Sequence, residues 1–388
     1  MTIRTERRIT RAKNAVVHPL RIAAVVATET VSGPGRQLAA LARALQDGGV
    51  ACLIIGLHRS GRPPSAFARF LEAAGVEYRI VEDRGPLDWR VASQVNAILR
   101  DWRPSIVQTH SYKATAVAYA LRALRAPWSW IGFYHGTTRE LLRVGLYHWV
   151  DRQLLRAADR VVVMSRSQIP LFPHSGPRVQ VIDNAVLQPA AGKAESRALE
   201  TSGLGRPLIG VVGRLSPEKG VDVFLDACAV LAQRKISFAG VIAGDGPERG
   251  RLQALCRRLG LDSQVQFVGH VENVEALYRS LDLLVLPSRS EGLPNTLLEA
   301  LQADVPVVAA AVGGVPDLVG SSLAASLVPP GSPAAFAEAI ELTLAHGDSP
   351  GAAAARASVV SRFSLERRLE AHLRLYHDVL DERTRRAS

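Results

Sequence analysis

Short apolar segments alternate along this chain with helix-like segments, and each apolar segment ends at a turn of Gly, Pro or polar residues. The first spans residues 21–27, and the last of the first half spans residues 178–182. The pattern restarts at residues 207–212, after a stretch rich in Pro, Ala, Gly and Ser at residues 187–206. Because parallel strands need a crossover connection, the alternation predicts parallel sheets with helices on both faces. We therefore expect the 388 residues to form two α/β, doubly wound domains that face across a cleft.

Composition limits the classes of partner and compartment. A formal net charge of +11 and a pI of about 10.1 suit a polyanion: nucleic acid, an anionic membrane or a phosphate-bearing substrate. We expect no nucleic-acid partner, because the chain has no zinc-ligand spacing, RNA-binding aromatic signature or helix-turn-helix signal. We expect no signal peptide, because no apolar h-region with a cleavage site follows the basic residues 1–15, and we expect the apolar segments to be too short to span a bilayer. We expect Cys52, Cys228 and Cys256 to be buried thiols in a reducing compartment. Together these features favour a cytoplasmic protein, soluble or peripheral on the inner face of the cell membrane.

The turn after the apolar segment 281–286 carries two carboxylates. Glu291 lies in the turn, and Glu299 lies in the helix that we expect at residues 296–303. Ligands of open α/β sheets bind at the carboxyl ends of the strands, and a helix N-terminus attracts anions. The turn therefore predicts a phosphate site flanked by carboxylates that hold hydroxyl groups. Two alternatives need no ligand: Thr296 and Glu299 could form a capping box, and Glu291 could be a solvated loop carboxylate.

A second constellation follows the first strand of the second half. Gly213 allows close approach of a ligand, and Arg214 and Lys219 place two cations beside the same crevice. Together with the helix N-terminus after Glu291, they predict a binding site for a diphosphate.

Three features of the first half have both a functional and a structural interpretation. His110 and His135 follow two strands, where ligand groups or buried core histidines are found. The turn at residues 33–36, before a helix expected at 37–46, is either a phosphate-cradling loop or an ordinary turn. The helix expected at residues 139–157 has an apolar stripe beside arginines, which suits either the core or an anionic membrane surface.

Five motifs of the second half resemble those of the retaining glycosyltransferases of family four, which have the GT-B fold of two Rossmann-like domains. They are Gly-Arg-Leu with Lys-Gly at 213–220, Gly-Asp-Gly-Pro at 244–247, Phe-Val-Gly-His-Val at 267–271, Ser-Glu-Gly-Leu-Pro-Asn with a Glu at 290–299, and Pro-Val-Val with Gly-Gly-Val-Pro-Asp at 306–317. The first half matches at fewer points, and it has Ala185 where the family usually has glycine.

The pattern of the chain and the resemblance together predict a plan of domains, in which the roles of the two domains and the place of the final helix are what the resemblance implies. It comprises a disordered basic arm at 1–18, an acceptor domain at 19–190, a linker at 191–206, a nucleotide-sugar donor domain at 207–360, and a final helix at 361–388 that packs back on the first domain.

The resemblance also implies roles for individual residues. Arg214 and Lys219 would bind the donor diphosphate, Glu291 the sugar hydroxyls and Glu299 the ribose, while His135 would lie at the reacting face of the sugar. The catalytic residues would be His135, Glu291, Arg214 and Lys219. The donor-binding residues would further include Gly213, Val268, His270, Val271, Gly292, Leu293, Pro294, Asn295 and Glu299; the acceptor or phosphate loop would include Gly33, Gly35 and Arg36.

The resemblance thus implies a hexosyltransferase that uses a UDP- or GDP-sugar and a saccharide or lipid-linked acceptor, in polysaccharide or lipopolysaccharide synthesis. No Asp-X-Asp occurs in the chain, so we expect neither a metal nor a cofactor. The basic charge makes an anionic membrane surface a further candidate partner. The alternatives are a nucleotide-sugar 2-epimerase on the same fold and a non-catalytic binding relative.

Overall fold

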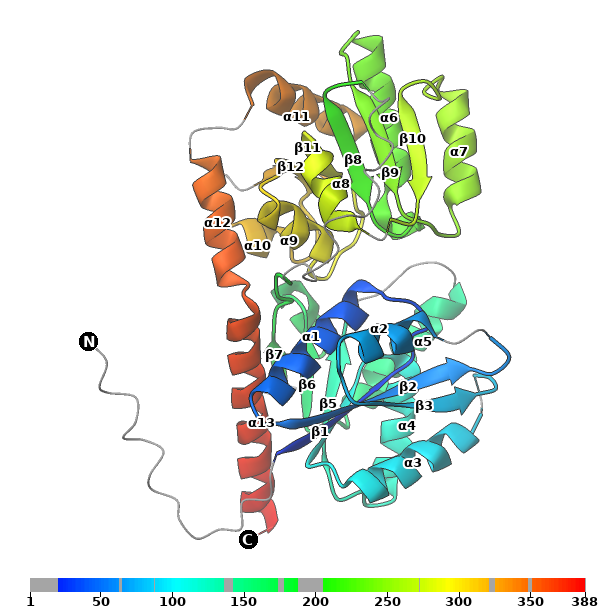
Figure 1. The fold of residues 1–388 in the computed structure, drawn as a ribbon, viewed down its shortest axis with the longest axis vertical. Helices are drawn as coiled ribbons and strands as arrows, with labels where there is room; N and C mark the ends of the chain where they lie inside the picture. Colours follow the sequence, from blue (N-terminus) through cyan, green and yellow to red (C-terminus); the bar gives the residue numbers. More distant parts are fainter. Residues whose placement is uncertain are drawn as a thin grey trace, which may run out of the picture.

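The computed structural model places two domains one above the other, with a long helix running beside the lower one (Figure 1). It describes residues 20–62, 65–86, 88–135, 142–173, 178–187, 205–271, 273–320, 325–347 and 351–387. The expected N-terminal arm and most of the expected linker lie outside these residues.

The N-terminal domain is built on a seven-stranded sheet in the order β3-β2-β1-β4-β5-β6-β7, in which every neighbouring pair is parallel. Its strands are β1 (Arg21–Val26), β2 (Ala51–Arg59), β3 (Tyr78–Asp83), β4 (Ile106–Thr109), β5 (Ser129–Tyr134), β6 (Arg160–Val163) and β7 (Val179–Val181). Its helices are α1 (Gly33–Asp47), α2 (Ala66–Ala73), α3 (Arg90–Trp102), α4 (Tyr112–Ala123), α5 (Leu142–Leu155) and the 3-10 helix η1 (Arg166–Leu171).

The C-terminal domain repeats the plan with a six-stranded parallel sheet in the order β10-β9-β8-β11-β12-β13. Its strands are β8 (Leu208–Val212), β9 (Ala239–Ala243), β10 (Val265–Gly269), β11 (Leu283–Leu286), β12 (Val307–Ala310) and β13 (Ser326–Val328). Its helices are α6 (Val221–Gln233), α7 (Arg249–Arg258), α8 (Val274–Ser280), α9 (Asn295–Gln302), α10 (Val315–Val319) and α11 (Pro333–His346), with the 3-10 helix η3 (Pro217–Lys219).

Buried apolar strands explain both sheets. The central strands β4, β5, β8, β9 and β11 are buried along almost their whole length, as expected for parallel strands covered on both faces. In each sheet the chain builds outward from one strand and then returns to its other side, so the order reverses between β1 and β4 and between β8 and β11. The prediction of two doubly wound α/β domains is confirmed.

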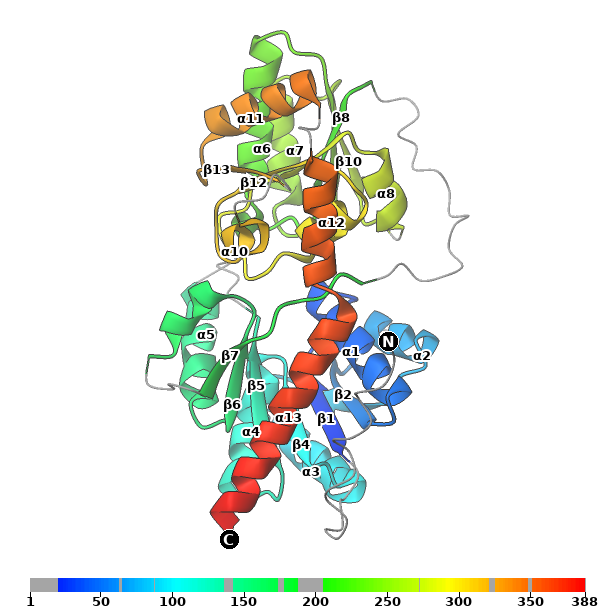
Figure 2. The same ribbon diagram turned by 90° about the vertical axis from the view of Figure 1, so that its left-hand side faces the viewer.

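Two helices at the end of the chain span both domains (Figure 2). α12 (Ala352–Arg362) packs on α9 of the C-terminal domain, and α13 (Leu365–Ala387) packs on α1 and β5 of the N-terminal domain. α12 was not expected from the sequence. Its buried Arg356 forms an ion pair of 2.7 Å with Asp304.

One turn differs from its expectation. The helix expected at residues 37–46 begins four residues earlier, because Ser32 caps it and Pro34 stands in its first turn. Gly33, Gly35 and Arg36 therefore belong to the first turn of α1 and not to a Gly-rich loop.

Candidate active site

In each sheet the strand order reverses at one point, between β1 and β4 or between β8 and β11. These two reversal points lie at the junction between the domains. In the C-terminal domain the turns after β8 and β11 carry the predicted donor-binding residues; in the N-terminal domain the turns after β1, β4 and β5 lead to α1, His110 and His135. Hydrogen bonds join the two sides: Gln37 Nε2 donates to Asn295 Oδ1 (3.1 Å), and Asn184 Nδ2 donates to the Leu293 carbonyl (3.0 Å). Ligands of such sheets bind at these points, so the junction is the candidate active site.

Glycine backbones shape the crevice beside β8. Gly244, with φ of +137°, packs so tightly on the turn after β8 that an added Cβ would lie 1.8 Å from the Gly213 carbonyl oxygen. A Cβ at Gly246 would lie 2.3 Å from the Leu215 carbonyl oxygen. Gly213 has φ of +148° and open space where its Cβ would be. The motif glycines thus bring two turns together and leave room above Gly213.

Lys219 and Glu291 form the central ion pair of the site. Lys219 Nζ donates to Glu291 Oε1 over 2.8 Å, and Ser288 Oγ donates to the same oxygen over 2.6 Å. The Glu291 side chain is 7% exposed. The alternative of a solvated loop carboxylate is therefore wrong, because Glu291 is a buried, paired anion between β8 and β11.

Glu299 faces Tyr278 and the first domain. Tyr278 Oη donates to Glu299 Oε2 over 2.9 Å. Burial raises the pKa of Glu299, while the Tyr278 hydrogen bond and the charge of Arg36 on α1 act to lower it. The capping-box alternative is wrong: α9 starts at Asn295 with Pro294 as its N-cap, so Thr296 is already helical and no side chain caps the helix.

The turn after Glu291 contacts the N-terminal domain through its backbone. A Cβ at Gly292 would lie 3.2 Å from the His135 carbonyl oxygen, and one at Gly33 would lie 2.4 Å from Asn295 Nδ2. Gly314 N donates to the Gly292 carbonyl over 2.8 Å, which fixes the turn from its other side. Gly292 and Asn295 thus lie against His135 and the first turn of α1, two of the places in the first half that the sequence indicates as candidate ligand sites.

The histidines of the first half contact each other. His110 Nδ1 and His135 Nε2 are 3.1 Å apart, and His110 Nε2 is 3.2 Å from Gln108 Oε1. Gln108 Nε2 donates in turn to the hydroxyl of Tyr376 on α13. Burial, assisted by the charge of Arg368, lowers the pKa of His135 to about 4.

Arg368 on α13 donates hydrogen bonds to side chains of α1 and of the turn after β7. Its Nη1 donates to Gln37 Oε1 (2.8 Å) and Asn184 Oδ1 (2.9 Å), and burial lowers the pKa of this arginine to about 10. Gln37 also exchanges two hydrogen bonds with the Ala185 backbone (2.7 and 3.0 Å). Ala185 has no positive φ, so the turn does not need the family's glycine.

The other nominated residues lie at the edge of the site. Val268 lies at the bulge of β10, between Phe267 and Gly269. His270 is exposed just beyond that strand, and Val271 packs on the core. Within the described ranges, no three His, Cys, Asp or Glu side chains are grouped so that they could hold a metal ion.

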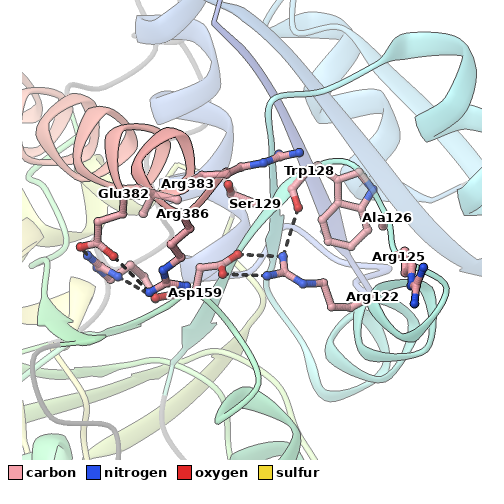
Figure 3. Close-up of a pocket in the computed structure, with 11 residues that line it drawn as sticks. Arg122, Arg125, Ala126, Trp128, Ser129, Asp159, Glu382, Arg383 and Arg386 are labelled. Carbon is pink, nitrogen blue, oxygen red and sulfur yellow. Dashed lines mark hydrogen bonds and ion pairs between the residues drawn. The ribbon is translucent and has the colours of Figure 1, made fainter. Parts of the chain in front are cut away.

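A cavity of about 260 Å³ lies at the other end of the N-terminal sheet, between the first residues of β5 and β6 and the last turns of α13 (Figure 3). Arg122 donates to Asp159 over 2.7 and 2.8 Å, and Glu382 pairs with Arg160 and, at 3.6 Å, with Arg386. Because β5 has six residues, this cavity is roughly 20 Å from the junction. Of these ion pairs, Arg160–Glu382 joins α13 to the first residue of β6.

Part of the apolar stripe on α5 does not face the core. Trp149 is 53% exposed and Val150 is 38% exposed, whereas Leu154 of the same stripe is half-buried. The core-facing interpretation is therefore wrong for Trp149 and Val150. Residues 139–141 lie outside the described part of the chain, and no described helix is long and apolar enough to cross a membrane.

Sequence reasoning missed Gln108, Tyr278, Arg368 and Tyr376. Gln108 stands two positions before a nominated histidine, which is the one local signal for it. Tyr278, Arg368 and Tyr376 lie in ordinary helical patterns, and their contacts with the site are made only by the fold.

Comparisons with known proteins find matches for both halves of the chain. The family model for the glycosyl transferase 4-like domain matches residues 32–184, and that for glycosyl transferases group 1 matches residues 193–358. The 2-deoxystreptamine N-acetyl-D-glucosaminyltransferase of Streptomyces fradiae is 29% identical, over 89% of this chain and 91% of its own length. The lipopolysaccharide core biosynthesis mannosyltransferase LpsB of Rhizobium meliloti is 30% identical, over 51% of this chain and 59% of its own. The chain spans about half the length of several curated relatives that it matches.

A solved structure shares the fold. The structure of Anabaena Alr3699/HepE in complex with UDP and glucose superposes with a TM-score of 0.78 at 19% identity, covering 92% of this chain and 99% of that chain. Two Rossmann-like domains that meet at their strand ends are the architecture of the GT-B fold. Within that architecture, residues 193–358 are similar to the glycosyl transferases group 1 and residues 32–184 to the glycosyl transferase 4-like domain.

Proposed function

We propose that this protein is a retaining glycosyltransferase that moves a hexose from a UDP- or GDP-sugar to a saccharide or lipid-linked acceptor. The observation that carries the proposal is the ion pair between the half-buried Lys219 and the buried side chain of Glu291, between β8 and β11, beside Arg214 and the open backbone of Gly213. A cation and a carboxylate at one reversal point suit a donor that is anionic at its diphosphate and rich in hydroxyls at its sugar.

The charges of the leaving group set the tasks of these residues. When the bond from the sugar to the diphosphate breaks, negative charge develops on the phosphate oxygens and the sugar becomes oxocarbenium-like. Arg214 and Lys219 neutralise the phosphate charge. Lys219 then shares its ammonium between the diphosphate and Glu291, whose second oxygen binds sugar hydroxyls.

Glu299 binds the ribose of the donor. Its carboxylate is held by the Tyr278 hydroxyl and lies near the charge of Arg36, so a hydroxyl pair of the ribose would complete its hydrogen bonds. Gly292 to Asn295 offer backbone groups to sugar and phosphate, and Val268, His270 and Val271 line the path of the base. Gly33, Gly35 and Arg36 cover the phosphates or the acceptor from α1. We propose that transfer needs no metal ion, since the cationic side chains of Arg214 and Lys219 would neutralise the phosphate charge in its place.

The relatives support a role in cell-surface polysaccharide or lipopolysaccharide synthesis. LpsB is named as a lipopolysaccharide core mannosyltransferase, and the Anabaena structure contains UDP and glucose. The Streptomyces relative is named for transfer to 2-deoxystreptamine. An acceptor screen should therefore contain both lipopolysaccharide core oligosaccharides and free aminocyclitols.

A thermal-shift screen tests the donor site. The wild type, Glu299→Ala and Arg214→Ala are compared with UDP, GDP, ADP and their sugar conjugates, since a ligand that binds the folded state raises the melting temperature. One nucleotide should stabilise the wild type and neither variant. If no nucleotide does so with or without acceptors, or if both variants respond like the wild type, the proposal is wrong.

We further propose that the protein works on an anionic membrane surface at the inner face of the cell membrane. The exposed Trp149 and Val150 on α5 support this, as does the net charge of +11. Sedimentation with anionic vesicles should exceed that with neutral vesicles and should fall for Trp149→Ala. Equal sedimentation with both vesicle types would contradict the membrane proposal without touching the transferase proposal.

A further inference from the structure

A chain of hydrogen bonds runs from the candidate active site into the core. It starts at His135, continues through His110 and Gln108, and ends at Tyr376 on α13. Gln108 and Tyr376 are buried, and His110 stacks on Phe133 with ring centroids 4.3 Å apart. The rings and the amide are therefore held in place by packing as well as by hydrogen bonds.

The amide of Gln108 sets the direction of the chain. Its nitrogen faces the Tyr376 hydroxyl, so its oxygen is the atom that faces His110 Nε2. A carbonyl oxygen only accepts, and His110 Nε2 must therefore carry the proton. A neutral imidazole has one donor and one acceptor, so His110 Nδ1 accepts the hydrogen bond from His135 Nε2.

Both rings are neutral in this setting. Burial lowers the pKa of His110 well below its ordinary value, and that of His135 to about 4. The charged group facing them is Arg368, and the titratable neighbour is His372, whose own pKa burial lowers to about 3. A second proton on either ring would place another positive charge beside a buried arginine.

We propose that Gln108 and His110 are positioning residues that hold His135 in the tautomer with hydrogen on Nε2, leaving Nδ1 to accept a hydrogen bond from a hydroxyl of the donor sugar. The tautomer follows from the orientation of the Gln108 amide together with the neutrality of the His110 ring. The role toward a sugar rests on the proposed function.

His372 supplies an internal reference for the test. Its Nδ1 lies 2.8 Å from the Arg368 carbonyl oxygen, which only accepts, so His372 carries its hydrogen on Nδ1. The protein therefore contains neutral histidines of opposite tautomers. The two tautomers differ in the nitrogen shifts of the ring, which NMR of protein labelled with ¹⁵N-histidine measures.

The first experiment is that spectrum, recorded at pH 7 without substrate, with resonances assigned by single His variants. We expect the Nε2–H pattern for His110 and His135 and the Nδ1–H pattern for His372. In His110→Phe, which keeps an aromatic ring on Phe133 but removes both nitrogens, His135 should lose its fixed pattern. A wild-type His135 with hydrogen on Nδ1, or charged, would overturn the tautomer assignment.

The second experiment measures transfer kinetics. His110→Phe should lower kcat by about 10- to 100-fold with little change in the KM of the donor, because the donor still binds but His135 is no longer oriented. Tyr376→Phe, which releases only the far end of the chain, should have a smaller effect in the same direction. His346→Ala, an exposed site on α11, is the control and should match the wild type.

The two experiments separate the failures. Unchanged kcat in a folded His110→Phe would overturn the positioning role even if the tautomers are as assigned. If no nucleotide-sugar supports transfer by the wild type, the proposed function fails, whereas the spectrum still decides the tautomer.

Discussion

The two domains share one sheet order but present opposite chemistry at their reversal points. In the C-terminal domain the turns after β8 and β11 carry Lys219, paired with Glu291, on a frame of tightly packed glycines. In the N-terminal domain the turns after β4 and β5 carry His110 and His135, which are neutral and half-buried. The same backbone plan thus makes one side that matches charge and another that can match hydroxyls without adding charge.

The difference also lies in what supports each side. The charged side is supported within its own domain, by neighbouring turns such as those at Gly213 and Gly244. The neutral side is supported from far along the chain, because α13 supplies Arg368 and Tyr376. Substitutions on the two sides should therefore have different effects on the transfer rate, on stability and on its pH dependence.

The largest expected effect is on the charged side. Arg214→Ala should lower kcat/KM by on the order of 10²- to 10³-fold, as for the loss of one preorganised donor to a developing anion. Arg257→Ala on the exposed face of α7 is the matched control and should leave the rate unchanged. Steady-state kinetics with the identified donor measure both. A loss below about tenfold for Arg214→Ala would place the diphosphate elsewhere.

A substitution that crowds the backbone should destabilise the turns beside β8 without removing any charged group. Gly244→Ala puts a methyl group 1.8 Å from the Gly213 carbonyl oxygen, at φ of +137°, and should lower the free energy of unfolding by about 2 to 3 kcal/mol. Gly250→Ala, in α7 with open space around it, should be neutral or slightly stabilising. Urea denaturation followed by circular dichroism compares them; equal stabilities would contradict the packing argument.

Acid should lower the free energy of unfolding through the neutral histidines of the N-terminal domain. The pKa of His372 is about 3 in the fold, against the ordinary value of 6.5, so unfolding takes up a proton once the pH falls below about 6.5. Stability is fully present above pH 6.5 and is lost as the pH falls, by about 1.4 kcal/mol per pH unit for each such histidine. His110 and His135 act in the same direction, whereas Asp151, whose pKa burial raises to about 6, acts in the opposite one.

His372→Phe keeps the ring that stacks on Phe133 and removes the titration. Its free energy of unfolding, measured by urea denaturation at pH 6.5, 5.5 and 4.5, should fall with a slope smaller by about one proton than that of the wild type. Parallel curves for the two proteins would show that His372 is protonated in the fold.

The smallest expected effect concerns metal ions. Because Arg214 and Lys219 would carry the phosphate charge, EDTA should leave the transfer rate within about twofold of its untreated value. Recovery of a lost rate on adding Mg²⁺ or Mn²⁺ would show that the cationic side chains are not sufficient. The same assay on Lys219→Ala would then reveal whether a metal replaces the ammonium.

Much of the fold could be predicted because its causes are local. The apolar segments that became β1, β8 and β11 were identified within two residues of their ends, since buried parallel strands are short apolar runs bounded by turns. β13 and α12 were missed, because three residues of strand and an Ala-rich helix carry no comparable period. The start of α1 was misjudged because Gly-Pro-Gly suggested a loop, whereas Ser32 and Pro34 are helix-starting residues.

The candidate site was predictable residue by residue but not as an arrangement. Arg214, Lys219, Glu291 and Glu299 could be nominated from their turns. That Glu291 is buried against Lys219, and that Glu299 binds Tyr278 and not the N-terminus of α9, depends on how α8, α9 and the turn after β8 pack.

The sequence by itself determined the two parallel sheets and the turns at their strand ends, because strand burial, glycine turns and helix starts are encoded within a few neighbouring residues. Only the tertiary structure decided which side chains meet at the junction. Gln108 binds Tyr376, 268 positions away, and Gln37 binds Asn295, 258 positions away. Such pairs leave no period in the sequence, since they depend on two sheets and a returning helix being in place at once.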